Sequence, residues 1–176
     1  MRFAGILVIA GVSALPAATL QKLSLDDMIR KSTQIVRGKV TGSTTVMRGP
    51  VIYTEYRVQP SDSYKGGSSA EINVFVAGGK YGSVTQTFSG SPSLREGQEY
   101  VLFLWTGRSG LTQVIGLSQG LFTMTKDPLG GPVLTRKAVS DTMLDSSGKV
   151  VEDTPVSVRL GEMVDRIHRT LAGVSR

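Results

Sequence analysis

The stretch E-Y-V-L-F-L-W, residues 99–105, decides the fold, because its apolar residues follow one another without interruption. Successive side chains of a β-strand point to opposite faces of the sheet. Both faces of this strand are therefore apolar from Tyr100 to Trp105, which is typical of a strand that is covered on two sides. We predict that it lies at the centre of the core.

Segments on either side of this strand alternate between apolar and polar residues, as half-buried strands do. They are Q-I-V-R-G-K-V-T (34–41), V-I-Y-T-E-Y-R-V (51–58), I-N-V-F-V-A (72–77), S-V-T-Q-T-F (83–88), L-T-Q-V-I-G-L (111–117) and L-F-T-M-T (121–125). Turns rich in glycine and proline separate them, and no helical pattern lies between them. The chain therefore predicts a mainly β protein, an antiparallel sandwich or barrel, in which the first two strands form a hairpin.

Two helices are expected at the ends of this β domain. Ser24 can cap a short N-terminal helix that ends near Ser32, with Asp27 completing a capping box. Apolar residues recur at a helical period near the C-terminus and predict a helix over 159–173 that packs on the barrel. We place the β-barrel domain at 22–125 and an irregular excursion, with room for one hairpin, at 126–158.

The first 18 residues have the pattern of a secretory signal peptide. A single charge, Arg2, precedes an apolar run from Phe3 to Leu15, and small residues follow Pro16. This run is shorter than the roughly 20 apolar residues of a membrane-spanning helix. The sequence thus predicts a secreted or periplasmic protein. It contains no cysteine, which excludes disulfides and thiolate zinc sites.

The remaining composition is that of one ordinary globular domain. The chain has 176 residues, of which 40% are hydrophobic and 19% charged, and its formal net charge is +6. This mild excess of basic residues favours anionic partners or surfaces.

The five residues G-L-S-Q-G (116–120) match the G-x-S-x-G signature of a serine hydrolase and make Ser118 a candidate nucleophile. Asp141 or Asp145, followed by His168, would complete the chain order of that triad. The residues after the motif alternate like a strand, however, whereas the signature requires a helix there. Glycines flanking a tight connection between strands explain the same pattern, so we predict a non-enzymatic protein with the Ser118 hydrolase as an exception.

Two further motifs are interpreted as turns. V-A-G-G-K-Y-G-S (76–83) resembles a phosphate-binding loop but lies between two strands, and S-S-G-K (146–149) lacks the other motifs of penicillin-recognising enzymes. One histidine and no cysteine cannot supply the usual zinc ligands. We therefore expect no metal and no cofactor.

The outward face of the first hairpin is the candidate binding surface. Arg37 and Lys39 on one strand and Tyr53 and Arg57 on the next would place cations beside aromatic rings, a combination that binds anionic or single-stranded polymers. Glu55 lies among them and can pair with a cation. The alternative is an ordinary solvated strand face.

The order of these elements resembles the netrin-like domain of the tissue inhibitors of metalloproteinases. The similarity covers roughly residues 25–125 and runs through I-V-R-G-K-V, S-Y-K-G-G, I-N-V-F-V and E-G-Q-E-Y-V-L-F-L. It implies an OB-type, five-stranded barrel. The chain also resembles uncharacterised exported bacterial proteins that carry V-x-G-G, E-G-x-E-Y-V-L-F-L and G-L-x-Q-G. That resemblance rests on five glycines of expected structural role: Gly78, Gly79, Gly97, Gly116 and Gly120.

The departure from the inhibitors limits what the resemblance implies. Their N-terminal cysteine binds the protease zinc, and this chain has no cysteine. The barrel is then the only shared property, and a barrel hosts many unrelated ligands. We therefore expect a secreted, non-enzymatic module that binds a protein or polymer partner through the hairpin face, or an OB-type binder of single-stranded nucleic acid or an anionic glycan there.

Overall fold

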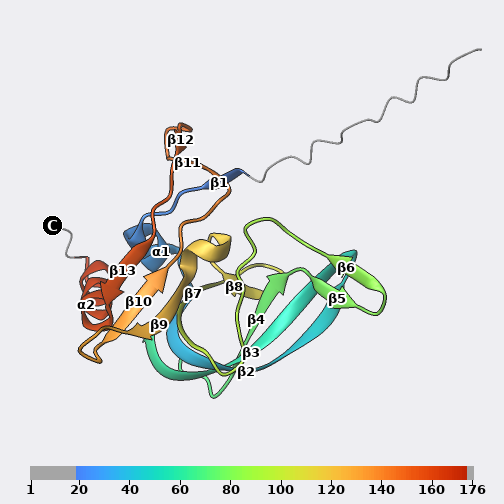
Figure 1. Ribbon diagram of the computed structural model, residues 1–176, viewed down its shortest axis with the longest axis horizontal. Coiled ribbons are helices and arrows are strands. Elements are labelled where there is room, and N and C mark those ends of the chain that lie inside the picture. The colour runs from blue at the N-terminus through green and yellow to red at the C-terminus, as the bar shows by residue number, and fades with distance from the viewer. Residues whose placement is uncertain (1–18, 174–176) are drawn as a thin grey trace, which may run out of the picture.

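The computed structural model describes residues 19–173 (Figure 1), so the predicted signal peptide lies outside the described residues. These residues form two α-helices and one 3-10 helix: α1 (Leu25–Lys31), η1 (Leu117–Gly120) and α2 (Leu160–Leu171). The strands are β1 (Thr19–Gln21), β2 (Gln34–Arg48), β3 (Val51–Lys65), β4 (Ile72–Ala77), β5 (Gly79–Tyr81), β6 (Val84–Gln86), β7 (Glu99–Thr106), β8 (Thr112–Val114), β9 (Leu121–Lys126), β10 (Pro132–Arg136), β11 (Thr142–Leu144), β12 (Val150–Val151) and β13 (Val156–Arg159).

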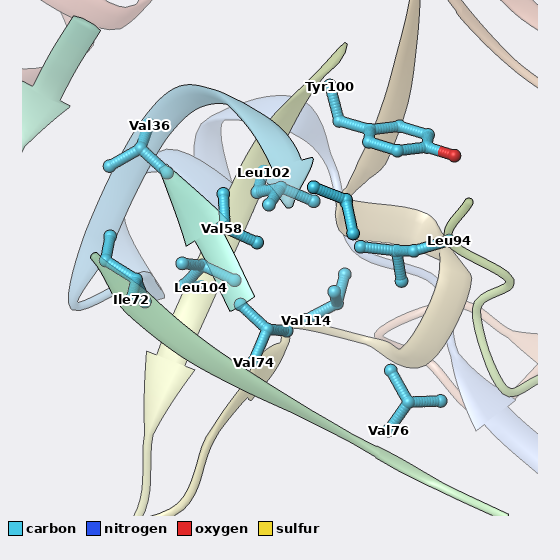
Figure 2. Packing of buried hydrophobic residues seen from close by; sticks show 11 residues of the cluster. Val36, Val58, Ile72, Val74, Val76, Leu94, Tyr100, Leu102, Leu104 and Val114 are labelled. Carbon is cyan, nitrogen blue, oxygen red and sulfur yellow. The ribbon is translucent and has the colours of Figure 1, made fainter. Parts of the chain in front are cut away.

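Eight of these strands form one antiparallel sheet, which confirms the predicted mainly β, antiparallel class. Its order is β13-β10-β9-β7-β2-β3-β4, and β8 pairs with β7 beside this path. The predicted closed barrel is not found, because no strand pairing among the described residues joins β4 to the rest of the sheet except through β3. β4 instead lies against β8 through side chains, with Val74, Val76 and Val114 in one apolar cluster (Figure 2).

The central strand β7 is buried on both faces, as its sequence predicts. Tyr100, Leu102 and Leu104 point into one apolar cluster, which Figure 2 shows between the curved strands. Val101 and Phe103 point into a second cluster on the opposite face. The uninterrupted apolar run of β7 therefore supplies two cores at once.

The two helices cover the second cluster, which contains Ile29 of α1 and Met163 and Ile167 of α2. α1 has the predicted capping box, because the Ser24 hydroxyl accepts from the Asp27 amide at 3.0 Å and the Asp27 carboxylate accepts from the Ser24 amide. Both helices match their predicted positions (Figure 1). In the range 19–173, no helix is long and apolar enough to cross a membrane.

The first hairpin is much longer than its sequence pattern predicts. β2 and β3 each have 15 residues and curve together along the sheet (Figure 1). Three register shifts interrupt their pairing, between Ile35 and Val36, Arg37 and Gly38, and Val40 and Gly42. Such bulges bend a strand and increase its twist. A turn at 49–50 joins the strands, close to the predicted one.

Residues 126–158, predicted to be mainly irregular, hold four short strands. β10 and β13 extend the main sheet beyond β9, and β11 pairs with β12 and, in parallel, with β1. Two aspartates form the turns of the hairpins. Asp127 accepts from the amides of Leu129 and Gly131, and Asp145 accepts from those of Ser147 and Lys149. Strands this short give too few residues for a periodic pattern, so the sequence identifies only the turns.

Candidate functional site

A pocket of about 700 Å³ opens beside the extended part of the main sheet. Tyr100 of β7, Leu121 and Thr123 of β9 and Thr135 of β10 line it from the sheet, and Ser118 of η1 lines it from one end. The segments 93–98, 136–138 and 155–157 provide the other lining residues. The pocket thus depends on the order β7-β9-β10-β13, which brings four distant parts of the sequence together.

The G-L-S-Q-G segment forms the wall that carries Ser118. Gly116 and Leu117 both have left-handed backbone, with φ of 60° and 57°, a conformation that costs a residue such as leucine about 1 kcal/mol. Gly120 is packed so closely that a Cβ there would lie 2.9 Å from the Ile115 carbonyl oxygen and 3.0 Å from that of Phe103. The glycines of this motif are therefore required for the backbone path.

Gln119, in the same segment, anchors the N-terminal strand. Gln119 as a whole is 2% exposed. Its Oε1 accepts from the Leu23 amide at 2.8 Å, and its Nε2 donates to the Gln21 carbonyl at 3.0 Å. The segment thus holds β1 in place on one side and presents Ser118 to the pocket on the other.

The arrangement around Ser118 is not that of a catalytic triad. Its hydroxyl makes no hydrogen bond with any of residues 19–173. Asp145 is engaged in its own turn, Asp141 accepts from the Ser89 hydroxyl, and His168 is exposed on α2. The strand β9 follows the motif directly, so the strand-to-helix turn of a hydrolase nucleophile is not formed.

Three cationic residues line the pocket: Arg95, Arg136 and Lys137. The Arg136 guanidinium is only 9% exposed and donates to both oxygens of Asp153, at 2.5 and 3.0 Å. Its Nε is buried without a hydrogen-bond partner among the described residues. The side chains of Arg95 and Lys137 make no hydrogen bond or ion pair there either.

Asp153 holds Arg136 in position from behind the pocket. Burial raises the pKa of the Asp153 carboxyl, but the hydrogen bonds from Arg136 and the Val139 amide, together with the Arg136 charge, outweigh this effect and bring the pKa down to about 2. Lys22 also lies 3.9 Å from this carboxylate. Asp153 is therefore ionised at neutral pH and fixes the guanidinium against the pocket wall.

The predicted hairpin site is divided by the long register of β2 and β3. Arg37 pairs with Asp62 and Lys39 with Gln59, whereas Tyr53 pairs with Val46. Seven residues separate Lys39 from Val46, which is about 23 Å along a strand. The predicted juxtaposition of Arg37 and Lys39 with Tyr53 is therefore wrong, because both strands continue as far as the turn at 49–50 and this turn sets the register.

The four hairpin residues also differ in their surroundings. Arg37 donates to Glu99 at 2.8 Å and lies 3.4 Å from Asp62, and the hydrogen bond to Glu99 raises the pKa of Arg37. Lys39 and Arg57 are exposed, and the Tyr53 ring meets Phe75 edge to face. Their role in binding stays a prediction, now for two separate places on the hairpin.

The pocket cations were missed by the sequence analysis. Arg95 follows a proline-containing turn, and Arg136 and Lys137 lie at the start of the predicted excursion, where no periodic or spaced pattern marks them. Asp153 is 17 residues from Arg136. Only Ser118 carried a signal, through the glycines around it.

Residues 19–173 contain no group of three or more histidine, aspartate or glutamate side chains placed to hold a metal ion. Comparison of the chain with family models, curated proteins and solved structures found no match.

Proposed function

We propose that this protein is an exported, non-enzymatic binding module that holds a small organic ligand in the pocket beside Ser118. The observation that carries the proposal is the pocket itself: its volume of about 700 Å³ falls within the range of about 300–1,000 Å³ for small-molecule sites. Its hydroxyl groups, from Ser93, Ser118, Thr123, Thr135 and Ser157, are suited to orienting a ligand. In the part of the chain that the structure describes, no histidine or carboxylate lines it.

The proposal includes an OB-type, netrin-like scaffold and export. The order β4-β3-β2-β7-β8, with β8 lying against β4, supports the scaffold, because an OB barrel has this neighbour order. The pattern of residues 1–18 supports export, as a leader with this charge and this length of apolar run directs secretion.

Nuclear magnetic resonance titration with a chemically mixed fragment set tests the binding function. We expect amide shifts that cluster at the pocket, for example at Ser118, Thr123 and Thr135. Two pocket-filling variants, Ser118→Trp and Thr123→Trp, should abolish them, while Ser109→Trp in an exposed turn should not. Binding that maps elsewhere, or no binding by any fragment, contradicts the proposal.

A second candidate is binding of an anionic polymer on the outer face of the hairpin. The Arg48 guanidinium lies 5.8 Å from the centre of the Phe75 ring, beside Tyr53, and this favours the polymer hypothesis. Affinity for heparin or single-stranded DNA should then fall linearly on a logarithmic scale as salt increases. An Arg48→Gln/Arg57→Gln variant that retains the wild-type salt dependence contradicts it.

A further inference from the structure

The charge of the pocket, in addition to its volume, restricts the chemical class of the ligand. Arg95, Arg136 and Lys137 line it, and among residues 19–173 no aspartate or glutamate does. Asp153 balances the charge of Arg136, which leaves the two other cations uncompensated. Two cations elsewhere in the described residues do have acidic partners: Arg37 has Glu99 and Arg166 has Asp26. The pocket therefore has a net positive charge.

A buried donor adds a second, independent observation. Asp153 occupies both terminal nitrogens of Arg136 and leaves Nε without a partner. A buried N–H that lacks an acceptor is costly, and buried donors in native proteins are nearly always satisfied. Arg136 lines the pocket, but its Nε is shielded from solvent, so this donor reaches a ligand only when the side chains around it shift. An anionic acceptor favours that shift most, because charge-assisted hydrogen bonds are the stronger ones.

The rest of the lining defines the body of the ligand. Leu121, Ala138, Pro155 and Val156 form an apolar part of the wall. Among the described residues that line the pocket, Tyr100 is the only aromatic one. It is 3% exposed, and its hydroxyl already accepts from the Arg95 amide. A stacking platform for a nucleobase or a sugar ring is thus missing from the lining. The wall suits an aliphatic group.

We infer that the pocket takes an acid group, a carboxylate or a phosphate ester, carried on an aliphatic body. Arg95 and Lys137 attract the acid group, and the apolar wall contacts the chain. Arg136 Nε donates to the acid group once the ligand has displaced the side chains that shield this nitrogen. This inference rests on the proposed function, since it names the ligand class of the same pocket.

Isothermal titration of the purified protein with four compounds of equal chain length tests it: hexyl phosphate, hexanoate, hexan-1-ol and hexylamine. We expect one or both anions to bind about tenfold or more tightly than the alcohol, and the amine to bind least. A comparison of the two anions separates a phosphate from a carboxylate site. In nuclear magnetic resonance, the Nε–H resonance of Arg136 should shift with the anions and stay in place with the alcohol.

Arg95→Gln/Lys137→Gln should remove the preference for anions and leave alcohol binding unchanged. Arg108→Gln/Lys149→Gln, the matched control, alters two exposed cations outside the pocket lining and should retain the preference. If pocket binding is indifferent to charge, the inference is overturned and the proposed function stands. If neither these compounds nor the mixed fragments bind in the pocket, both are overturned.

Discussion

Asp153 stabilises the fold by an amount that depends on pH and can be worked out from its environment. Its side chain is 2% exposed and accepts from Arg136 and from the Val139 amide. Its pKa is about 2 in the folded protein, against an ordinary value of 3.8. A lowered pKa means that the folded state favours the ionised carboxylate. The stabilisation is therefore present above about pH 4 and is lost as the pH falls through 3.8 toward 2.

Asp153→Asn has nearly the shape of the protonated acid and removes this contribution at every pH. One pKa unit corresponds to about 1.4 kcal/mol, so the change from 3.8 to about 2 is equivalent to about 2.5 kcal/mol. We expect the variant to be less stable than the wild type by about 2.5 kcal/mol at neutral pH. At about pH 2 the two proteins should differ by only about 0.4 kcal/mol.

Urea denaturation monitored by far-UV circular dichroism from about pH 2 to 7 measures the difference. Other lowered carboxyl groups, such as Asp26 and Asp27, contribute equally to both proteins, so subtraction isolates Asp153. Asp165→Asn, on the exposed side of α2, is the control and should follow the wild type. A difference between wild type and Asp153→Asn that stays constant over the whole pH range would refute the electrostatic account of this pair.

Three further substitutions test the packing and the backbone of the fold. Gly38→Ala should destabilise the protein by about 1–3 kcal/mol, because the new Cβ would lie 2.8 Å from Val58 Cγ1 and 2.9 Å from the Gln59 carbonyl oxygen. Chemical denaturation measures this loss of stability. Gly67→Ala is the control and should be neutral, because its new Cβ meets nothing within 4 Å. Gln119→Ala leaves the Leu23 amide and the Gln21 carbonyl without their partner and should lower the free energy of unfolding by about 2 kcal/mol or more. Hydrogen exchange at the Leu23 amide should accelerate, and an unchanged exchange rate would contradict the anchoring role. Ser24→Ala removes the α1 cap and should cost about 1 kcal/mol, whereas Ser68→Ala in an exposed loop should leave the unfolding free energy unchanged.

The local sequence was sufficient to predict features that depend on a single helix or strand. The apolar run of β7 predicts burial on both faces, and Ser24 with Asp27 predicts the start of α1. In each case the signal lies within a few consecutive residues. Such features depend on strand and helix periodicity alone, and this is why they were predictable.

The hairpin register could not be predicted in this way. Each bulge adds a residue to one strand and moves the following side chains relative to the partner strand. Both strands continue to the turn at 49–50, so the residue opposite Arg37 is Asp62 and not one near Tyr53. Of the three register shifts, the two between this pair and the turn cancel, and they displace only the residues between them. The sequence pattern identified two strands correctly, but it contains no information about where their pairing is interrupted.

The pocket could not be predicted from the sequence for a different reason. Arg95, Arg136 and Ser118 become neighbours only through the pairing of β7 with β9 and of β9 with β10. No residue of the group requires another at a fixed spacing, as the ligands of a zinc site would. Its cations are visible in the sequence only as part of the general basic excess.

Ser118 shows how a motif can be identified correctly and its role interpreted too narrowly. The G-x-S-x-G pattern allows two interpretations, a catalytic serine or a pair of glycines with a structural role. In the fold, Gly116 and Gly120 are structural, Gln119 anchors β1, and Ser118 still faces the pocket with a free hydroxyl. Strained backbone such as that of Leu117 persists only where its surroundings hold it in place, and the two hydrogen bonds of Gln119 do so here. The strain therefore lies in the wall of the pocket that is proposed to hold the ligand.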